Sequence, residues 1–136
     1  MTLSDKINQW KSEFEDILFM GDEMTLYSHI IDLGKKLNQN PLNESLRNEH
    51  TRVSYCQFQL FVDWEDGQWK SYSDGMISAG YAYILVDIFN SITPEEASQA
   101  QPEDFNELGL QDMLSMNRTN GLNQMISIMA NRAKTI

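Results

Sequence analysis

The stretch MISAGYAYILVDIFN, Met76 to Asn90, carries apolar residues on nearly every side of the helix of about four turns that it predicts. A helix at the surface would keep a polar face, so we expect this one to be buried at the centre of the domain. Before it come two runs rich in aromatic and β-branched residues, VSYCQFQLFVDW (53–64) and QWKSYS (68–73), separated by the turn signal EDG. These runs predict an antiparallel hairpin beside the central helix.

Two amphipathic helices are predicted at the start of the chain. Apolar residues recur every three or four positions as far as Gly21, which suits a helix C-terminus, and Asp22 is expected to cap the second helix. Lys35 and Lys36 lie where the negative end of that helix should be, and residues 38–51 predict an exposed, turn-rich connection. The side chains predicted to face inward are Leu3, Ile7, Trp10, Phe14 and Ile17, followed by Leu26, Tyr27, Ile30, Ile31 and Leu37.

Further helices are predicted after the central one. Thr93 is expected to cap a helix that begins at Pro94, with Glu96 completing a capping box, and QPED predicts another start near Pro102. A C-terminal amphipathic helix follows, because one stripe contains Leu122, Met125, Ile126 and Met129. This order of elements predicts one α+β domain over residues 1–136, with a small antiparallel sheet covered by several helices.

The composition argues against several classes of function. With 10 Lys and Arg against 20 Asp and Glu, the formal charge of -10 would repel a phosphate backbone, so no nucleic-acid partner is expected. A protein with a basic patch fits this charge, although the charge also serves solubility alone. No apolar run reaches the roughly 18 residues of a membrane span, and the N-terminus lacks a signal-peptide pattern. A lone cysteine agrees with a reducing compartment, so we expect a cytoplasmic protein that does not enter a membrane.

Cys56 is the one candidate nucleophile. His29 and His50 are far apart and neither pairs with Cys56 in a ligand spacing, so no metal site is expected, and no phosphate-binding loop or hydrolase motif is present. Strand alternation gives the alternative that Cys56 is a small core residue on one face with Phe58, Leu60 and Val62, and periodicity alone favours that interpretation.

Arg118 is the candidate cation for this thiol. It lies in SMNRTNG (115–121), a polar stretch between two apolar segments, which predicts a loop able to fold back over a site. A nearby cation would favour the reactive thiolate of Cys56. The alternative is an ordinary charge at a helix terminus, and composition does not choose between the two.

Three segments together resemble the SufE family of sulfur-acceptor proteins: SYCQFQLFVDW, SDGMISAGYAYILVDIFNSITPEE and LGLQDMLSMNRTNGLNQMISIMANRAK. They carry four family elements in order, namely a strand opening on Cys-Gln, a Ser-Asp pair before a buried helix, a Thr-Pro cap and an Arg-x-Asn-Gly-Leu element. The similarity runs from about Ile7 to Lys134. It implies a SufE/NifU-like α+β fold, with Cys56 as persulfide acceptor, Arg118 as the arginine that stabilises the thiolate, and Asp74 as an acidic site or docking position.

The resemblance also implies the partners. A pyridoxal-phosphate cysteine desulfurase would donate sulfur from its persulfide and be stimulated, and an iron-sulfur scaffold protein would lie downstream. Pyridoxal phosphate would belong to the desulfurase, so the chain itself is expected to bind no cofactor. It is expected to have no independent turnover and to be a monomer or a weak dimer.

The chain departs from the family pattern around the site. Tyr55, Phe58 and Phe61 replace a Gly, a Ser and a Trp, Ala79 stands where a lysine is common, and MLSM (113–116) replaces a His-Leu-Ser-Pro run. The scaffold is therefore kept while the rim of the site is altered, which bears on the identity of the partner more than on the sulfur chemistry.

Two alternatives to a sulfur carrier stay open. The first is an adaptor that regulates a desulfurase on the same fold without carrying sulfur, and the altered rim motivates it. The second is an unrelated enzyme with a catalytic cysteine, which would need a base beside the thiol that the sequence does not reveal.

Overall fold

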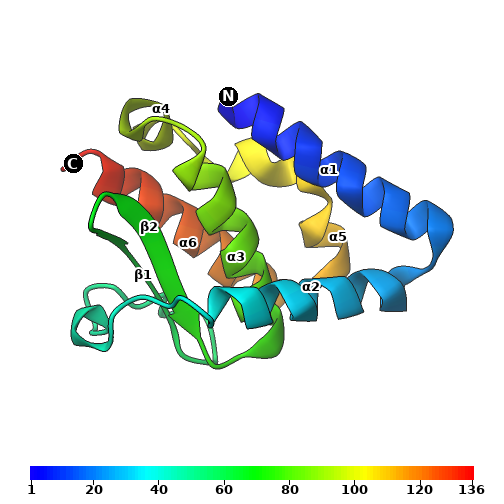
Figure 1. The fold of residues 1–136 in the computed structure, drawn as a ribbon, viewed down its shortest axis with the longest axis horizontal. Helices are drawn as coiled ribbons and strands as arrows, with labels where there is room; N and C mark the ends of the chain where they lie inside the picture. Colours follow the sequence, from blue (N-terminus) through cyan, green and yellow to red (C-terminus); the bar gives the residue numbers. More distant parts are fainter.

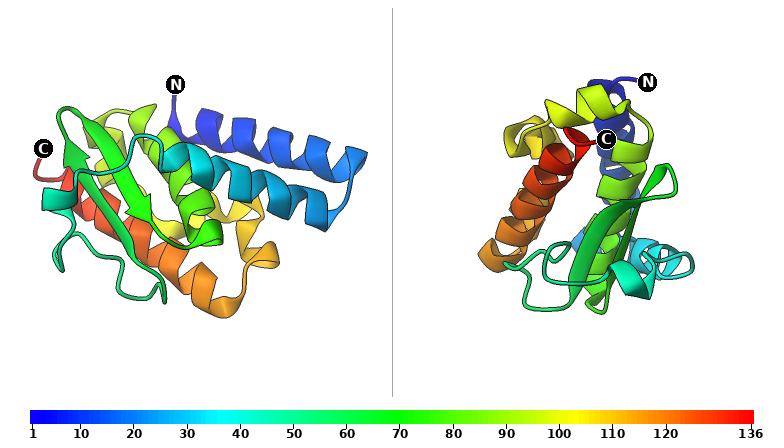
Figure 2. Two further views of the ribbon diagram at one scale, coloured as in Figure 1. Left: turned by 60° about the horizontal axis from the view of Figure 1, so that its bottom comes forward. Right: turned by 90° about the vertical axis from the view of Figure 1, so that its left-hand side faces the viewer.

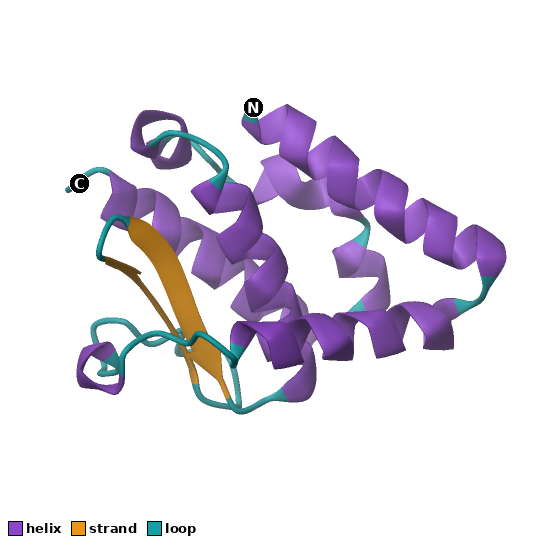
Figure 3. Ribbon diagram, in the orientation of Figure 1, coloured by secondary structure: helices purple, strands orange, loops and turns teal.

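The computed structural model describes the backbone of residues 1–136 and the side chains of residues 1–110 and 112–136. Helices, a hairpin and further helices follow one another along the chain, which confirms the predicted α+β class (Figures 1 and 3). The elements are α1 (Leu3–Met20), α2 (Glu23–Leu37), the 3₁₀ helix η1 (Glu44–Leu46), β1 (Leu60–Glu65), β2 (Gln68–Ser73), α3 (Met76–Asn90), α4 (Pro94–Ser98), the 3₁₀ helix η2 (Pro102–Leu108), α5 (Leu110–Met113) and α6 (Met116–Ala133).

Helix α3 is buried on nearly every side, as predicted, and it has the predicted bounds. Figure 1 shows it in the middle of the molecule, and it packs against α2, β2, α1 and α6. Its contact with α2 is close at Gly80, where a Cβ would lie 2.3 Å from the carbonyl oxygen of Ile30. Only a residue without a side chain allows the two backbones to approach this far.

The two strands form an antiparallel hairpin with the register Leu60↔Ser73 to Glu65↔Gln68. The turn between them, Asp66-Gly67, has positive φ at both residues, 52° and 82°, as the mirror-image type I turn of a two-residue hairpin requires. β2 packs against α3 and β1 contacts α6, so helices cover one face of the sheet (Figure 2).

The first strand is shorter than predicted, because it begins at Leu60 rather than at Val53. The amide of Val53 donates to the carbonyl of Leu60 at 2.8 Å, and the amide of Val62 donates to the carbonyl of Thr51 at 2.9 Å. Residues 51–53 therefore run antiparallel to β1, and the chain reverses between Val53 and Leu60. The predicted alternation across this segment is wrong.

The N-terminal helices confirm the predicted pattern in most respects. The Asp22 side chain accepts from the Thr25 amide at 3.0 Å and caps α2 as predicted. Of the residues predicted to face inward, Leu3, Ile17, Tyr27 and Ile31 are only partly buried. The connection after α2 is mostly polar but contains the fully buried Leu42.

The predicted capping box at α4 is half formed. Thr93 accepts from the Glu96 amide at 3.1 Å, so the cap is confirmed. The Glu96 carboxylate instead accepts from the Leu3 amide at 2.8 Å, which ties α4 to the start of α1. The helix predicted near Pro102 is present, in 3₁₀ form, as η2.

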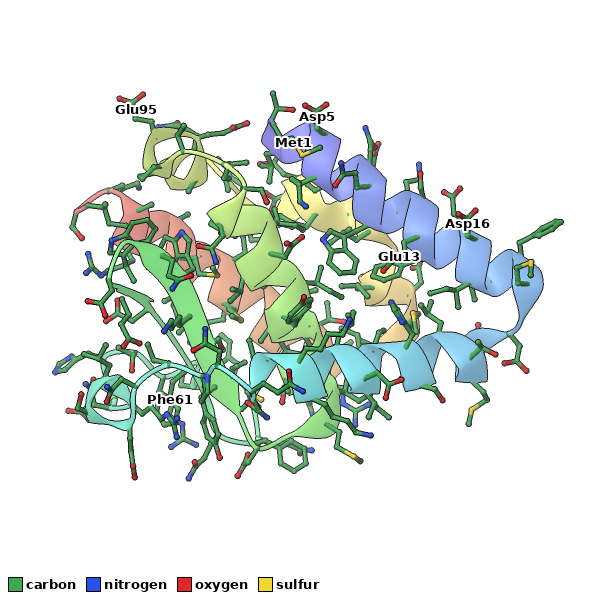
Figure 4. The ribbon with its side chains drawn as sticks, in the orientation of Figure 1. Met1, Asp5, Glu13, Asp16, Phe61 and Glu95 are labelled. Carbon is green, nitrogen blue, oxygen red and sulfur yellow. The ribbon has the colours of Figure 1, made fainter. Side chains whose placement is uncertain are left out.

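The acidic side chains gather on the outside of the molecule. Figure 4 shows Asp5 and Asp16 on the outer side of α1 and Glu95 on α4, and all three are exposed. Within the part of the chain that is described, no helix is both long and apolar enough to cross a bilayer.

Candidate functional site

Cys56 lies at the bend of the chain reversal between Val53 and Leu60. Its amide donates to the carbonyl of Val53 at 3.2 Å, which tightens the bend. The side chain points inward, is 8% exposed and belongs to the hydrophobic core. Cys56 therefore does not share a strand face with Leu60 and Val62; the thiol is buried at the tip of a loop.

A cavity of about 270 Å³ opens beside this thiol. It forms where the loop, the first turn of α3 and the first turn of α6 meet, and its lining is mainly apolar. The lining residues are Cys56, Gln57, Phe58, Met76, Ile77, Ser78, Ser115, Asn117 and Arg118. The two strongest sequence candidates, Cys56 and Arg118, are thus brought to one site.

Arg118 belongs to a helix and not to a loop, so the prediction for SMNRTNG is wrong in this respect. Ser115 caps α6, and its hydroxyl accepts from the Arg118 amide at 3.4 Å. Arg118 is half-buried in the first turn of α6. A cation there is opposed by the positive end of the helix dipole, which makes a purely structural role at this helix end unfavourable.

Asp74 does not line the cavity. It is exposed, and its carboxylate accepts from the Gln59 amide at 2.8 Å, while its own amide donates to the Gln59 carbonyl at 3.2 Å. These bonds fasten the second half of the Cys56 loop to the end of β2. The geometry gives Asp74 a role in shaping the loop, and its role in docking stays a prediction.

The residues that replace the usual family pattern differ in exposure. Tyr55 is 67% exposed and Phe58 is 43% exposed, whereas Phe61 is largely buried in β1. The Phe58 ring lies against Gly75, where a Cβ would lie 2.8 Å from Cγ of the ring. Phe58 and Met76 thus add exposed aromatic and thioether groups to the lining of the cavity, and the exposed Tyr55 and Met116 are chain neighbours of the lining residues Cys56 and Ser115.

Gln124 is a residue that sequence analysis missed. From α6 its side-chain oxygen accepts from the Tyr55 amide at 2.8 Å, and its side-chain nitrogen donates to the Ser54 hydroxyl at 2.8 Å. One side chain thus clamps the first half of the Cys56 loop. No local pattern marks this residue, because a glutamine on a helix surface is common.

Tyr81 is the second residue that the sequence did not reveal. It lies in α3, is 1% exposed, and its hydroxyl forms no hydrogen bond of regular geometry with a described residue. Burial, above all, raises the pKa of Tyr81 above its ordinary value; the charge on Cys56 and a side-chain hydrogen-bonding contact with Cys56 raise it further, and Arg118 opposes the shift. A buried phenol, a thiol and a guanidinium therefore share one site.

The site offers thiol chemistry. Among the described residues, no group of three or more His, Cys, Asp or Glu side chains is placed to hold a metal ion. What the arrangement provides is a shielded sulfur, a cation and a hydroxyl donor beside a cavity of about 270 Å³, with a loop that presents the sulfur at its tip.

Comparison with known proteins gives a consistent result. The family model SufE, described as an Fe-S metabolism associated domain, matches residues 11–133. A SufE-like protein of Synechocystis is 28% identical over 116 residues, which cover 82% of this chain and 72% of that protein. The cysteine desulfuration protein SufE of Plasmodium falciparum is 30% identical over 101 residues, which cover 68% of this chain and 40% of that protein.

The fold is also found in a solved structure. The solution structure of a hypothetical protein from Thermus thermophilus superimposes with a TM-score of 0.71 at 19% identity, covering 96% of this chain and 94% of the other. At this identity the likeness shows a shared fold.

Proposed function

Since the chain belongs to the SufE family, whose domain is associated with Fe-S metabolism, we propose that Cys56 accepts sulfane sulfur from a cysteine desulfurase and passes it towards iron-sulfur cluster assembly. The observation that carries the proposal is the placement of the chain's sole cysteine at a loop tip, beside a cavity that Arg118 also lines. Acceptance by Cys56 would stimulate the desulfurase by relieving it of its persulfide.

The transfer step is a thiol exchange. The Cys56 thiolate attacks the terminal sulfur of the partner's persulfide, a new S–S bond forms at Cys56, and the partner's S–S bond breaks so that its cysteine leaves as a thiolate. The proton of the terminal sulfur stays on that sulfur. No oxidant or metal enters the balance, which agrees with a site made of one sulfur, a cation and a hydroxyl.

The buried position of Cys56 supports a docking step before transfer. At 8% exposure the thiol is shielded from solvent and borders the cavity, so we propose that docking moves the loop and brings the thiol to the partner's persulfide. The loop is fastened at Ser54 and Tyr55 by Gln124, and at Gln59 by Asp74. These are exposed hydrogen bonds, each worth only about 1 kcal/mol, so docking can replace them.

The surface around the cavity fits a protein partner. Tyr55, Phe58, Met76 and Met116 present exposed aromatic and thioether groups, which are typical of protein interfaces. The net charge of -10 suits a partner with a basic face. The proposed partner is a pyridoxal-phosphate cysteine desulfurase, and pyridoxal phosphate belongs to that enzyme.

Two finer parts of the proposed function come from the family: an iron-sulfur scaffold protein is the proposed recipient, and the chain is proposed to turn over no substrate by itself. The proposed location, the cytoplasm, comes instead from the lone cysteine. We propose a single SufE-like domain over residues 1–136 that acts as a monomer or weak dimer.

The burial of Cys56 also favours a second candidate function. A thiol that packs in the hydrophobic core, behind exposed aromatic residues, is compatible with an adaptor that binds and regulates a desulfurase without carrying sulfur. The adaptor and the carrier share the docking surface and differ only in whether Cys56 forms a persulfide.

Intact-protein mass spectrometry distinguishes the two functions. The chain is mixed with a cysteine desulfurase, pyridoxal phosphate and free cysteine, with Cys56→Ser as the matched control. The carrier gains about one sulfur atom, which a reductant removes, and the serine variant binds the desulfurase but gains none. If the desulfurase binds and stays active but the wild type gains no sulfur, the carrier hypothesis is wrong and the adaptor takes its place.

A further inference from the structure

The Tyr81 hydroxyl is a buried polar group that the proposed transfer step does not yet use. It lies in α3, at 1% exposure, and no described residue forms a hydrogen bond of regular geometry with it, although the Cys56 side chain is near enough to affect its pKa by hydrogen bonding. Leaving a buried hydroxyl unpartnered is unfavourable, and a phenylalanine would fill nearly the same volume without that cost. An unpartnered buried donor of this kind calls for an explanation in terms of a ligand or a changing partner.

Two residues define where this hydroxyl points. A Cβ built at Gly121 of α6 would lie 2.8 Å from the hydroxyl oxygen, 3.7 Å from Cβ of Cys56 and 3.8 Å from its Cα. The hydroxyl and the base of the Cys56 side chain therefore border the same position on α6, and the hydroxyl is near enough to Cys56 for their side chains to interact. The absence of a side chain at Gly121 leaves the space that the hydroxyl occupies.

We propose that the Tyr81 hydroxyl donates a hydrogen bond to Sγ of Cys56 whenever that sulfur is anionic. The inference rests on the proposed function, because an anionic sulfur arises there twice: as the nucleophile that accepts sulfur and as the leaving group when sulfur is delivered. In delivery, a receiving thiolate bonds to the terminal sulfur, the S–S bond at Cys56 breaks, and its electron pair remains on Sγ, which then accepts from Tyr81. The resting thiol is a weak acceptor, so the contact between the two side chains is expected to strengthen when Cys56 loses its proton.

The charged groups around Cys56 agree with this role. Arg118 on α6 is the charged side chain among the residues that line the cavity. Tyr81 on α3 is not one of the lining residues, but it is a titratable group that interacts with Cys56 and Arg118. Burial holds the pKa of Tyr81 above its ordinary value of 10.0, and charge on Cys56 adds to this effect. The phenol therefore keeps its proton and remains a donor at neutral pH. A Cys56 thiolate would then be stabilised by two neighbours, the Arg118 guanidinium and the Tyr81 hydroxyl.

The test uses Tyr81→Phe, which removes the hydroxyl and keeps the ring, and Tyr83→Phe as a matched control on the same helix. Cys56 is loaded without any desulfurase: an aromatic disulfide forms a mixed disulfide with Cys56, and hydrosulfide displaces the aromatic thiolate to leave the persulfide. Release of the sulfur to added dithiothreitol is followed by intact mass, and alkylation of the unloaded thiol by iodoacetamide is followed across pH. Because the chain has one cysteine, both signals report on Cys56 alone.

We expect sulfur release from Tyr81→Phe to be about tenfold slower than from the wild type, since a hydrogen bond to a charged group is lost. Its alkylation profile should move to higher pH, and its melting temperature should stay equal or rise, because an unpartnered hydroxyl has been removed. Tyr83→Phe should follow the wild type in release and in alkylation. A residue with a structural role alone would change the melting temperature without moving the pH profile.

Two results would overturn the inference. One is a Tyr81→Phe variant with wild-type release and alkylation, which would leave Tyr81 as a packing residue. The other is a loss of folding in that variant, which would show that the hydroxyl has a structural partner. Because no desulfurase is present, these results are independent of whether a desulfurase delivers sulfur to Cys56, so failure of the proposed function is recognised separately.

Discussion

The two ends of α3 are built differently. At the C-terminal end, aromatic rings fill the space: Trp69 meets Phe89 edge-on at 5.8 Å, and Phe89 stacks on Phe105 at 6.0 Å. At the N-terminal end, Met76, Ile77 and Ser78 border the cavity of about 270 Å³ beside Cys56, whereas the pocket that Trp69 and Asn90 line at the C-terminal end measures about 140 Å³. One helix thus holds the solid core at one end and the candidate site at the other.

Polar groups follow the same division. The Asn90 side chain at the C-terminal end accepts from the Trp69 amide at 2.7 Å and donates to the Trp69 carbonyl at 3.1 Å. On the side of the site, the Tyr81 hydroxyl forms no hydrogen bond of regular geometry; among the described residues, Oδ1 of Asn123 on α6 is also buried without a partner. The difference from Asn90 agrees with the proposed hydrogen bond from Tyr81 to an anionic Cys56.

The largest effect on stability is expected at the C-terminal end of α3. Phe89→Ala removes a fully buried ring between Trp69 and Phe105, and we expect the free energy of unfolding to fall by about 3–5 kcal/mol. Met76→Ala, at the exposed rim of the other end, serves as the control and should change it by less than about 0.5 kcal/mol. Urea denaturation measures both. Equal losses of unfolding free energy in the two variants would show that the two ends of α3 do not differ in packing.

A smaller loss of stability is expected at the site. In Gly121→Ala the new Cβ lies 2.8 Å from the Tyr81 hydroxyl, and the crowding exceeds the gain in helix propensity, so we expect a net loss of about 1–2 kcal/mol.

A double-mutant cycle identifies the cause of that loss. The atoms next nearest to the new Cβ are at 3.7 Å or more, so the ring without its hydroxyl lies at an ordinary contact distance. Gly121→Ala combined with Tyr81→Phe should therefore recover most of the stability. Strictly additive effects would show that the hydroxyl is not the crowded group.

The smallest effect on stability is expected for Arg118→Ala. Removing a cation from the first turn of α6 should leave the melting temperature unchanged or slightly raised. Sulfur acceptance by Cys56 should become several-fold slower, because the thiolate loses its neighbouring positive charge. Lys35→Ala, which removes an exposed cation elsewhere on the surface, is the control and should accept sulfur at the wild-type rate. A marked loss of thermal stability in Arg118→Ala would assign the arginine a structural role instead.

The C-terminal end of α3 could be predicted from the sequence, whereas the candidate site could be predicted only in part. Residues 76–90 carry a continuous apolar pattern, and Thr93 with Pro94 marks a helix start by local rules, so those elements follow from neighbouring residues. The chain reversal at Cys56 contains no Gly, Pro, Asn or Asp between residues 53 and 60. Without these turn residues, its alternating polar and apolar side chains predict a strand. Its shape depends on pairing with β1, which is a tertiary contact.

The neighbours of Cys56 depend on packing between distant segments. Arg118 was identified from a polar stretch, but that stretch is the first turns of α6, whose cap Ser115 resembles a loop residue. In the sequence, Tyr81 is one more aromatic residue in an apolar helix. Only the packing of α3 against α6 and the Cys56 loop shows that its hydroxyl is buried near Cys56. Gln124 likewise becomes informative only once the loop lies against α6.

The hydrogen bonds between Gln124 and the Cys56 loop also determine what fraction of the free protein has this part of the loop released. Two exposed hydrogen bonds together contribute about 1–3 kcal/mol, so a state in which only this clamp is broken comprises roughly 1–15% of the molecules at room temperature. A released state of that population exists before any partner binds, so a desulfurase can bind it by conformational selection. Exchange of this kind is measurable by nuclear magnetic resonance relaxation at the amides of Ser54 and Tyr55 in the free protein.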